Sequence, residues 1–398
     1  MGNPPADNDL SVTRRTFIRK SAGVAVGLGP VTAQSDETES GGHLKFLEPI
    51  DGAVLHARLG KRVADGLEIE VTGTAPMGAK VLIQGRPANN EGGAFRGTAI
   101  LRGPETEIVA TIDGNAREEC RIRVLWEQNS RRRYRIAIDD NSFFLRDITQ
   151  KKYASLFDCF YLGMLRDLHA RHGARFTLNI YYTTDDGWDL RQFPDRYRRE
   201  WEENATWLRL AFHARANEPA CPYEDAPVEK LMADLDLIAG EIHRFAGPAT
   251  YSPPIVIHWG MTKPEAWRKL HERGARVLGG YFRRNRDRWE VNYRVDEFRS
   301  EWLSRHDLLK DFPSGIVFSK IDMVVNSTPL GEIVPKMESL AADPRQGEII
   351  DLLTHEQYFW PFYKNYLPDH ALRMERAIEF LTRQGYEAVF LQDEMGAI

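Results

Sequence analysis

The sequence predicts a mixed α/β protein, in which a small β-sandwich precedes a distorted (β/α) barrel of seven or eight repeats. The 398 residues are 42% hydrophobic and 28% charged, which is typical of a globular chain with more than one domain. Short alternating strands fill 43–127, whereas from residue 133 onward strands alternate with helices, as in parallel α/β folds. The formal net charge of −5 provides no basic field, so we expect no nucleic-acid partner.

The N-terminus has the pattern of an export signal. Arg14 and Arg15 precede Phe17, a short apolar stretch rich in glycine and alanine follows, and small residues end it at Ala33. This pattern resembles the twin-arginine signal, which implies the twin-arginine export machinery as a partner and a periplasmic or extracellular location. We therefore expect a signal peptide over 1–33 and a polar linker over 34–42. No apolar run reaches the roughly 18 residues that span a bilayer, so we expect no transmembrane segment.

The region 43–127 has the pattern of a β-sandwich. Turn residues separate short strands, which we expect at 67–71, 79–84, 94–101, 107–112 and 120–126. The opening, 48–52, resembles that of bacterial immunoglobulin-like modules attached to carbohydrate-active enzymes. A spacer, a docking surface and a weak glycan binder are all compatible with this sandwich.

The region 133–398 alternates between strands and helices. Gly173, Gly274 and Gly385 each follow a helical pattern and precede an apolar run, as expected of helix ends. We expect strands at 134–140, 175–182, 207–213, 255–258, 275–282, 316–322, 349–355 and 388–391. We expect helices at 153–172, 226–245, 264–273, 330–342 and 369–384.

Titratable side chains stand at the ends of five of these strands. In parallel barrels the carboxyl ends of the strands meet at one rim, where the chemistry of such enzymes is found. Such positions hold Asp139 with Asp140, His213, His258, Asp322, and His355 with Glu356. A barrel without a site does not need these groups, so their recurrence indicates an enzyme.

These groups suggest metal-assisted acid–base chemistry. Asp139 and Asp140 repel one another, and a bound cation or a shared proton would relieve the repulsion. One carboxylate could then hold a divalent metal while the other acts as a base, although a helix cap is an equally good interpretation. His213 and His258 could be metal ligands or satisfied core histidines.

The segment that begins at His355 has the highest concentration of candidate catalytic and aromatic residues. His355 could act as a general acid or base, and Glu356 could orient it. Tyr358 and Trp360, together with Trp259, could form an aromatic surface for a substrate or could simply pack. Asp322 could be a ligand, a second base or a partner of Lys320.

The order of these motifs resembles the NodB-type polysaccharide deacetylase superfamily, over about 133–398. The resemblance implies a distorted (β/α) barrel in which Asp and His side chains bind a metal, zinc being the expected ion. It implies that Asp139 is the catalytic base, Asp140 and His213 are metal ligands, and His355 is the general acid. The second histidine of the family motif is absent, because Asn217 and Glu218 stand where it is expected. The third ligand could therefore be Glu218, Asn217 or His258.

The expected function is an exported, metal-dependent hydrolase that removes acyl groups, such as acetyl, from a polysaccharide or oligosaccharide. Two alternatives remain open at this point. The same barrel could cleave a glycan chain without a metal, as a glycoside hydrolase or a lyase. It could also bind glycans without catalysis.

Overall fold

The computed structural model describes residues 43–395, which belong to one compact unit. The expected signal peptide (1–33) and linker (34–42) lie outside these residues. Within 43–395, no helix has the length and hydropathy that crossing a membrane requires.

Residues 45–126 form two five-stranded sheets. Strand β4 buries Leu67, Ile69 and Val71 on one face, as its alternating sequence predicts. The first sheet contains β1 (Lys45–Glu48), β3 (Lys61–Val63), β4 (Gly66–Thr74), β7 (Asn89–Glu91) and β8 (Ala94–Leu101). The second contains β2 (Val54–Leu55), β5 (Val81–Ile83), β6 (Arg86–Pro87), β9 (Glu105–Ile112) and β10 (Asn115–Trp126). The immunoglobulin-like assignment stays a prediction.

A seven-stranded sheet, all of whose pairs are parallel, forms the centre of the rest of the chain. Its order is β14 (Tyr251–Ser252), β13 (Leu208–Ala214), β12 (Phe176–Tyr181), β11 (Arg133–Asn141), β21 (Ile349–His355) and β20 (Met323–Val324), with β22 (Glu387–Ala388) paired to β11. Strands β11, β12, β13 and β21 are buried almost throughout, as expected of parallel strands covered on both faces.

Three further strands lie next to this sheet. They are β15 (Val277–Gly280), β18 (Leu308–Lys310) and β19 (Val317–Lys320). Between β15 and β18 the chain forms a hairpin of β16 (Arg283–Asn285) and β17 (Arg288–Glu290). The Gly279 N–H donates to Ile255 O at 2.7 Å, and the Asp322 N–H donates to Asp351 O at 2.9 Å. Backbone hydrogen bonds thus join β15 to the segment that follows β14, and join the segment between β19 and β20 to β21. The fold is mixed α/β, and the closed barrel stays a prediction.

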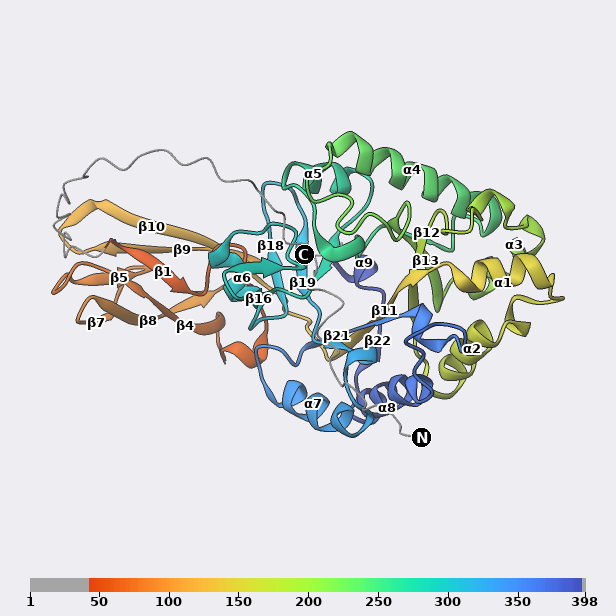
Figure 1. Cartoon of the computed structure of the whole chain (residues 1–398). Coiled ribbons are helices and arrows are strands. Elements are labelled where there is room, and N and C mark those ends of the chain that lie inside the picture. The colour runs from red at the N-terminus through yellow and green to blue at the C-terminus, as the bar shows by residue number, and fades with distance from the viewer. Residues whose placement is uncertain (1–42, 396–398) are drawn as a thin grey trace, which may run out of the picture. The chain divides into compact units, whose positions relative to one another are not determined.

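Helices cover the outer side of the parallel strands (Figure 1). Helix α4 packs against β13 and α5, and α8 packs against α2 and α7. The α-helices are α1 (Phe143–Lys151), α2 (Phe160–His172), α3 (Arg198–Asn204), α4 (Val228–Phe245), α5 (Glu265–Glu272), α6 (Glu297–Leu303), α7 (Leu330–Ala342), α8 (His370–Arg383) and α9 (Leu391–Glu394). Short 3₁₀ helices are η2 (Ala57–Leu59), η3 (Leu156–Asp158), η4 (Leu190–Gln192), η5 (Asp195–Tyr197), η6 (His258–Gly260), η7 (Val325–Ser327) and η8 (Glu356–Phe359).

Two of the expected strands are wrong in part. The apolar run 255–258 is not a strand: Pro253 and Pro254 lack backbone N–H groups, the short strand β14 ends before them, and His258 begins the η6 turn. The run 388–391 is split, because β22 ends at Ala388 and Leu391 begins α9. By contrast, the expected helix 330–342 and strand 349–355 are confirmed.

Candidate metal centre

The end of β11 carries Asp139 and Asp140. Neighbouring side chains on a regular strand point to opposite faces. Here the backbone of Asp140 is left-handed (φ 61°), and the pairing of β11 with β12 shifts between Ile138 and Asn141. The irregularity lets both carboxylates approach one histidine, with Asp139 Oδ2 at 3.9 Å and Asp140 Oδ1 at 3.1 Å from His213 Nε2.

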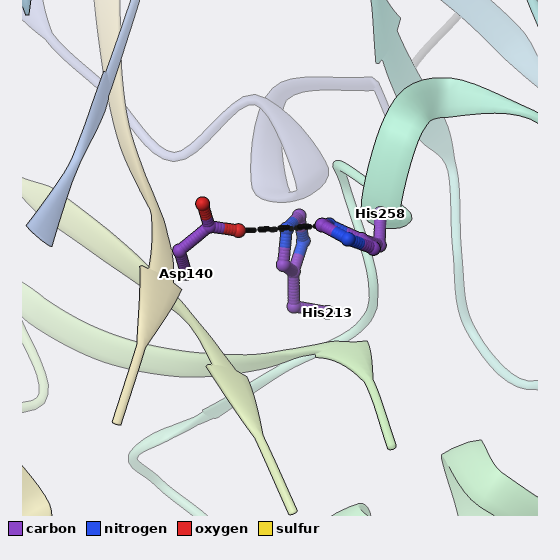
Figure 2. A group of neighbouring side chains, drawn as sticks. All are labelled: Asp140, His213 and His258. Carbon is purple, nitrogen blue, oxygen red and sulfur yellow. Dashed lines mark hydrogen bonds and ion pairs between the residues drawn. The ribbon is translucent and has the colours of Figure 1, made fainter. Parts of the chain in front are cut away.

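Two histidines complete a group with Asp140. His213 lies near the end of β13, two strands from β11, and His258 begins the η6 turn. His213 Nε2 lies 3.0 Å from His258 Nδ1, and Asp140 Oδ1 lies 3.5 Å from His258 Nδ1. Figure 2 shows the three side chains pointing toward one another. The structure thus brings together all three residues that we expected to bind a metal.

The outer nitrogens of both rings face backbone carbonyl groups. His213 Nδ1 lies 2.8 Å from Val256 O, and His258 Nε2 lies 3.2 Å from Asn217 O. A carbonyl oxygen only accepts hydrogen bonds, so these nitrogens carry protons in the neutral rings. The lone pairs of His213 Nε2 and His258 Nδ1 then face the same point. Metal-binding histidines typically have this outer hydrogen bond.

The distances fit a tetrahedral metal site. Ligands at 2.0–2.1 Å from a tetrahedral zinc ion stand roughly 3.3 Å apart. The three ligand atoms here are separated by 3.0, 3.1 and 3.5 Å. They are two imidazole nitrogens and one carboxylate oxygen, a donor set that suits zinc and similar ions.

Burial and neighbouring charges set the titration of this group in the absence of a metal. Burial opposes ionisation of Asp140, but the His213 hydrogen bond and the nearby histidine charges bring its pKa well below the usual range. Burial lowers the pKa of His213, but Asp139 and Asp140 outweigh it and raise that pKa. Burial and His213 lower the pKa of His258 to about 3. A proton on His213 is therefore the alternative to a metal at this point.

Asp139 and His355 lie beside the group on adjacent strands. They are register partners across β11 and β21, which places their backbones about 4.8 Å apart. Burial raises the pKa of Asp139, and Asn179 Nδ2 donates to its Oδ1 at 2.6 Å. His355 Nδ1 donates to Asn326 Oδ1 at 2.9 Å, which leaves Nε2 of the neutral ring as its other functional atom.

Glu356 does not orient His355, contrary to our expectation. Its fully buried carboxylate accepts the N–H groups of Ser142, Phe143 and Phe144 at 2.6–2.9 Å, together with Trp360 Nε1 at 3.1 Å. These backbone groups begin helix α1, where negative charge is favourable. This geometry assigns Glu356 a role in holding α1 and not in catalysis.

The three aromatic residues that we expected at a substrate surface differ in burial. Trp360 is only 4% exposed and packs edge-on against Phe160 and Phe143, so its ring is not available as a platform. Tyr358 is half-buried and lies edge-on to His355, with ring centroids 6.1 Å apart. Trp259 is half-buried and edge-on to His258 at 6.0 Å.

The remaining candidates lie apart from the ligand atoms or contact them indirectly. Asp322 accepts from Lys320 Nζ at 3.1 Å and from the Asp351 N–H at 2.9 Å, which places it in a separate buried cluster. Glu218 is exposed and accepts from the Ala220 N–H at 3.1 Å. Asn217 contacts the site through its backbone carbonyl at His258 and through Oδ1, which lies 3.2 Å from Tyr181 Oη.

Four residues of the site escaped the sequence analysis. Tyr181 Oη donates to Asp140 Oδ1, and Gln357 Nε2 donates to Asp140 Oδ2 at 2.7 Å. The others are Asn179 and Asn326, which hold Asp139 and His355. Asn179 and Tyr181 end an apolar strand, the same signal that we had applied only to acids and histidines. No local pattern marks Gln357 or Asn326.

No protein-family model and no curated protein matches the chain. Among solved structures it is similar to 4-alpha-glucanotransferase from Thermococcus litoralis, at 11% identity and a TM-score of 0.45, over 68% of this chain and 41% of that one. It is similar to the Bc1960 peptidoglycan N-acetylglucosamine deacetylase, at 10% identity and a TM-score of 0.35, over 66% of this chain and 87% of that one. It is also similar to a family 4 acetyl xylan esterase from Clostridium thermocellum, solved with a cobalt ion, at 10% identity and a TM-score of 0.32, over 66% of this chain and 90% of that one. At these scores the likenesses identify neither the fold nor the activity of this chain.

Proposed function

We propose that the chain is an exported, metal-dependent hydrolase that removes acyl groups from a carbohydrate. Asp140, His213 and His258 would hold a divalent ion, with zinc as the proposed ion. One observation carries this proposal: the lone pairs of His213 Nε2 and His258 Nδ1 meet at 3.0 Å beside a carboxylate oxygen. Two buried acceptors facing each other are unfavourable unless a metal ion or a proton lies between them, and we propose the metal ion as the occupant in the active protein.

The chain's own residues supply the acid and the base. When bound, the metal would polarise the acyl carbonyl and make a water more acidic. Asp139, whose pKa burial raises, would accept the proton of the attacking water. His355, as the imidazolium, would donate its Nε2 proton to the leaving group and end as the neutral ring, whose Nδ1–H stays bound to Asn326 Oδ1. Asn179 would keep the Asp139 carboxylate in place.

We propose a carbohydrate substrate on the strength of a group of half-buried and exposed aromatic rings beside His355, together with the family resemblance. Tyr358 lies next to His355 and 5.5 Å from Tyr363, and the ring of Phe143 lies 6.4 Å from Tyr363. Phe362, whose ring is 5.1 Å from Phe143, is 61% exposed. These rings offer flat apolar faces that lead outward from the proposed acid.

Export and domain division are proposals as well. We propose that 1–33 directs the protein through the twin-arginine machinery to the periplasm or the outside of the cell. We further propose that 43–127 is an immunoglobulin-like module and that 133–398 is a deacetylase-like barrel. Cleavage of a glycan chain without a metal receives less support, because Glu356, one of the carboxylates that such a mechanism would use, is committed to the start of α1.

Metal analysis of the purified protein tests this function. We expect about one divalent ion per chain, lost in Asp140→Asn, His213→Ala and His258→Ala and kept in the exposed-histidine control His243→Ala. Asp139→Asn should keep the ion but reduce acetate release from acetylated glycans by about 10²–10⁴-fold. A protein without bound metal, or one whose activity survives chelation, would refute the proposal.

A further inference from the structure

The hydroxyl of Tyr181 is directed at the same point as the three proposed ligand atoms. Tyr181 is 3% exposed, and its ring centroid lies 5.3 Å from that of His213 and 5.3 Å from that of His258. Oη donates to Asp140 Oδ1 and lies 3.1 Å from His258 Nδ1. Tyr181 therefore contacts two of the three ligand atoms directly.

A second backbone irregularity places this side chain. Tyr181 ends β12, between β11 and β13, and the pairing of β12 with β13 shifts between Ile180 and Tyr181. The shift in β11 at Asp140 lies on the neighbouring strand. Two adjacent strands thus depart from regular pairing where their side chains turn toward the same histidines. Such irregularities commonly re-aim side chains beside active sites.

The Tyr181 hydroxyl lies near three hydrogen-bond acceptors but can donate only one hydrogen bond. Its neighbours are Asp140 Oδ1, His258 Nδ1 and, at 3.2 Å, Asn217 Oδ1. A phenol has one proton, and Asp140 receives it. His258 Nε2 carries that ring's proton toward Asn217 O, so His258 Nδ1 faces Oη with a lone pair. The oxygen and the nitrogen are both electron-rich and buried, an arrangement that a cation would stabilise.

We propose that Tyr181 is a fourth protein group of the metal centre, with Oη facing the ion together with Asp140, His213 and His258. This inference rests on the proposed metal site. The resulting donor set has two nitrogens and two oxygens and no sulfur, which suits zinc, cobalt, nickel, copper or iron and not the oxygen-only preference of magnesium or calcium. With Oη as a fourth protein group, a substrate oxygen would have to bind as a fifth ligand or take the place of Oη.

Titration with Co²⁺ tests the role of Tyr181. We expect the unmodified protein to bind Co²⁺ and to develop visible absorption bands that report its coordination. Tyr181→Phe, which keeps the ring, should still bind but about 10–100-fold more weakly, as for other groups that support a metal, and its bands should change. Tyr182→Phe is the matched control, because the Tyr182 hydroxyl makes no hydrogen bond to the three ligand residues; it should behave like the unmodified protein.

The outcomes separate the two proposals. If the unmodified protein does not bind Co²⁺, the metal site itself fails. If Tyr181→Phe binds Co²⁺ with unchanged affinity and spectrum, the metal site stands and the inference about Tyr181 is overturned. A measurement without any variant guards against misfolding of Tyr181→Phe: Co²⁺ should perturb the ultraviolet tyrosine absorption of the unmodified protein, and an unperturbed tyrosine band also overturns the inference.

Discussion

At single side chains, hydrogen-bond partners distinguish groups that can react from groups that hold the backbone. His355 and Glu356 are neighbours in the sequence, and both suggested catalysis. His355 has one ring nitrogen bound to Asn326 and is half-buried, whereas both oxygens of Glu356 accept hydrogen bonds from backbone N–H groups at the start of α1. On the proposed function, His355 is therefore the residue of the pair that reacts, whereas the hydrogen bonds of Glu356 give it a structural role.

Glu356 gives a prediction about pH. Burial raises its pKa from 4.5 to about 7, although the hydrogen bonds from α1 oppose the shift. Between these values the folded protein holds a proton that the unfolded chain has lost, so the contribution of Glu356 to the free energy of unfolding decreases as the pH rises. The total change is on the order of 3 kcal/mol. Urea unfolding of the unmodified protein and Glu356→Gln at pH 5 and pH 8 measures it.

From pH 5 to pH 8, the free energy of unfolding of the unmodified protein should decrease relative to that of Glu356→Gln. The exposed Glu332 serves as the control, because Glu332→Gln should differ from the unmodified protein by the same amount at both pH values. Parallel pH dependences for the unmodified protein and Glu356→Gln would contradict the prediction.

Among the secondary-structure elements, the ends of β11 and β12 do most to form the site. The left-handed backbone at Asp140 and the register shift at Tyr181 interrupt regular strand alternation. An L-residue other than glycine is strained by about 1–2 kcal/mol in the left-handed region. The protein accepts this strain at a position where it brings a second carboxylate to His213.

Paired substitutions measure this strain. Asp140→Gly and Asp140→Ala both remove the side chain, and only the alanine variant keeps the left-handed penalty. We expect Asp140→Gly to be the more stable of the two by about 1 kcal/mol, measured by thermal or urea unfolding. The control pair is Asp139→Gly and Asp139→Ala, where the backbone is an ordinary strand and alanine should be the more stable. The same order at both positions would show that Asp140 is unstrained.

The segment after β21 gives a prediction about substrate binding. Phe362 is 61% exposed at the outer end of the rings that start at Tyr358. On the proposed function, Phe362→Ala should raise KM for a long acetylated glycan several-fold, through loss of a stacking contact of about 1 kcal/mol, and leave kcat unchanged. Leu372→Ala removes an exposed apolar side chain from α8 and should change neither constant. An unchanged KM for Phe362→Ala would exclude Phe362 from the substrate surface.

Across the described chain, backbone contacts join the N-terminal sheets to the later strands. The Lys310 N–H donates to Gly52 O at 2.8 Å, and Ala53 bridges to Leu309. Arg58 Nη1 donates to Gly347 O at 2.9 Å. These contacts agree with the assignment of residues 43–395 to one compact unit.

Gly52 allows the closest of these contacts. Its backbone is left-handed (φ 86°), and a Cβ atom there would lie 2.0 Å from Lys310 O. Gly52→Ala should lower the free energy of unfolding by at least about 2 kcal/mol, from backbone strain and overlap together. Hydrogen exchange at the Lys310 amide should speed up as well. Gly85→Ala is the control, since Gly85 is also left-handed (φ 78°) but has open space around it, and it should cost only about 1 kcal/mol. Equal losses would show that the Gly52 contact is not tight.

Much of the architecture followed from local patterns. The spacing of apolar residues correctly predicted helix 330–342 and strand 349–355, because each element buries the side chains that this spacing places together. The same patterns failed at 255–258, where two prolines precede an apolar run, and they did not mark helix α1, whose start depends on the distant Glu356.

The sequence alone was enough to select Asp140 and His213 as candidate ligands, since polar groups that follow apolar strands collect at one edge of a parallel sheet, whereas it left the third ligand open among His258, Asn217 and Glu218. Only the folded chain decided that Glu356 binds the start of a helix, that Trp360 is buried, and that Tyr181, Asn179 and Asn326 form hydrogen bonds with Asp140, Asp139 and His355. These roles depend on partners that are mostly distant along the chain and on two departures from strand register. The local order of residues marks only Asn179 and Tyr181, by their position near the end of an apolar strand, and it marks neither their partners nor the shifts in register.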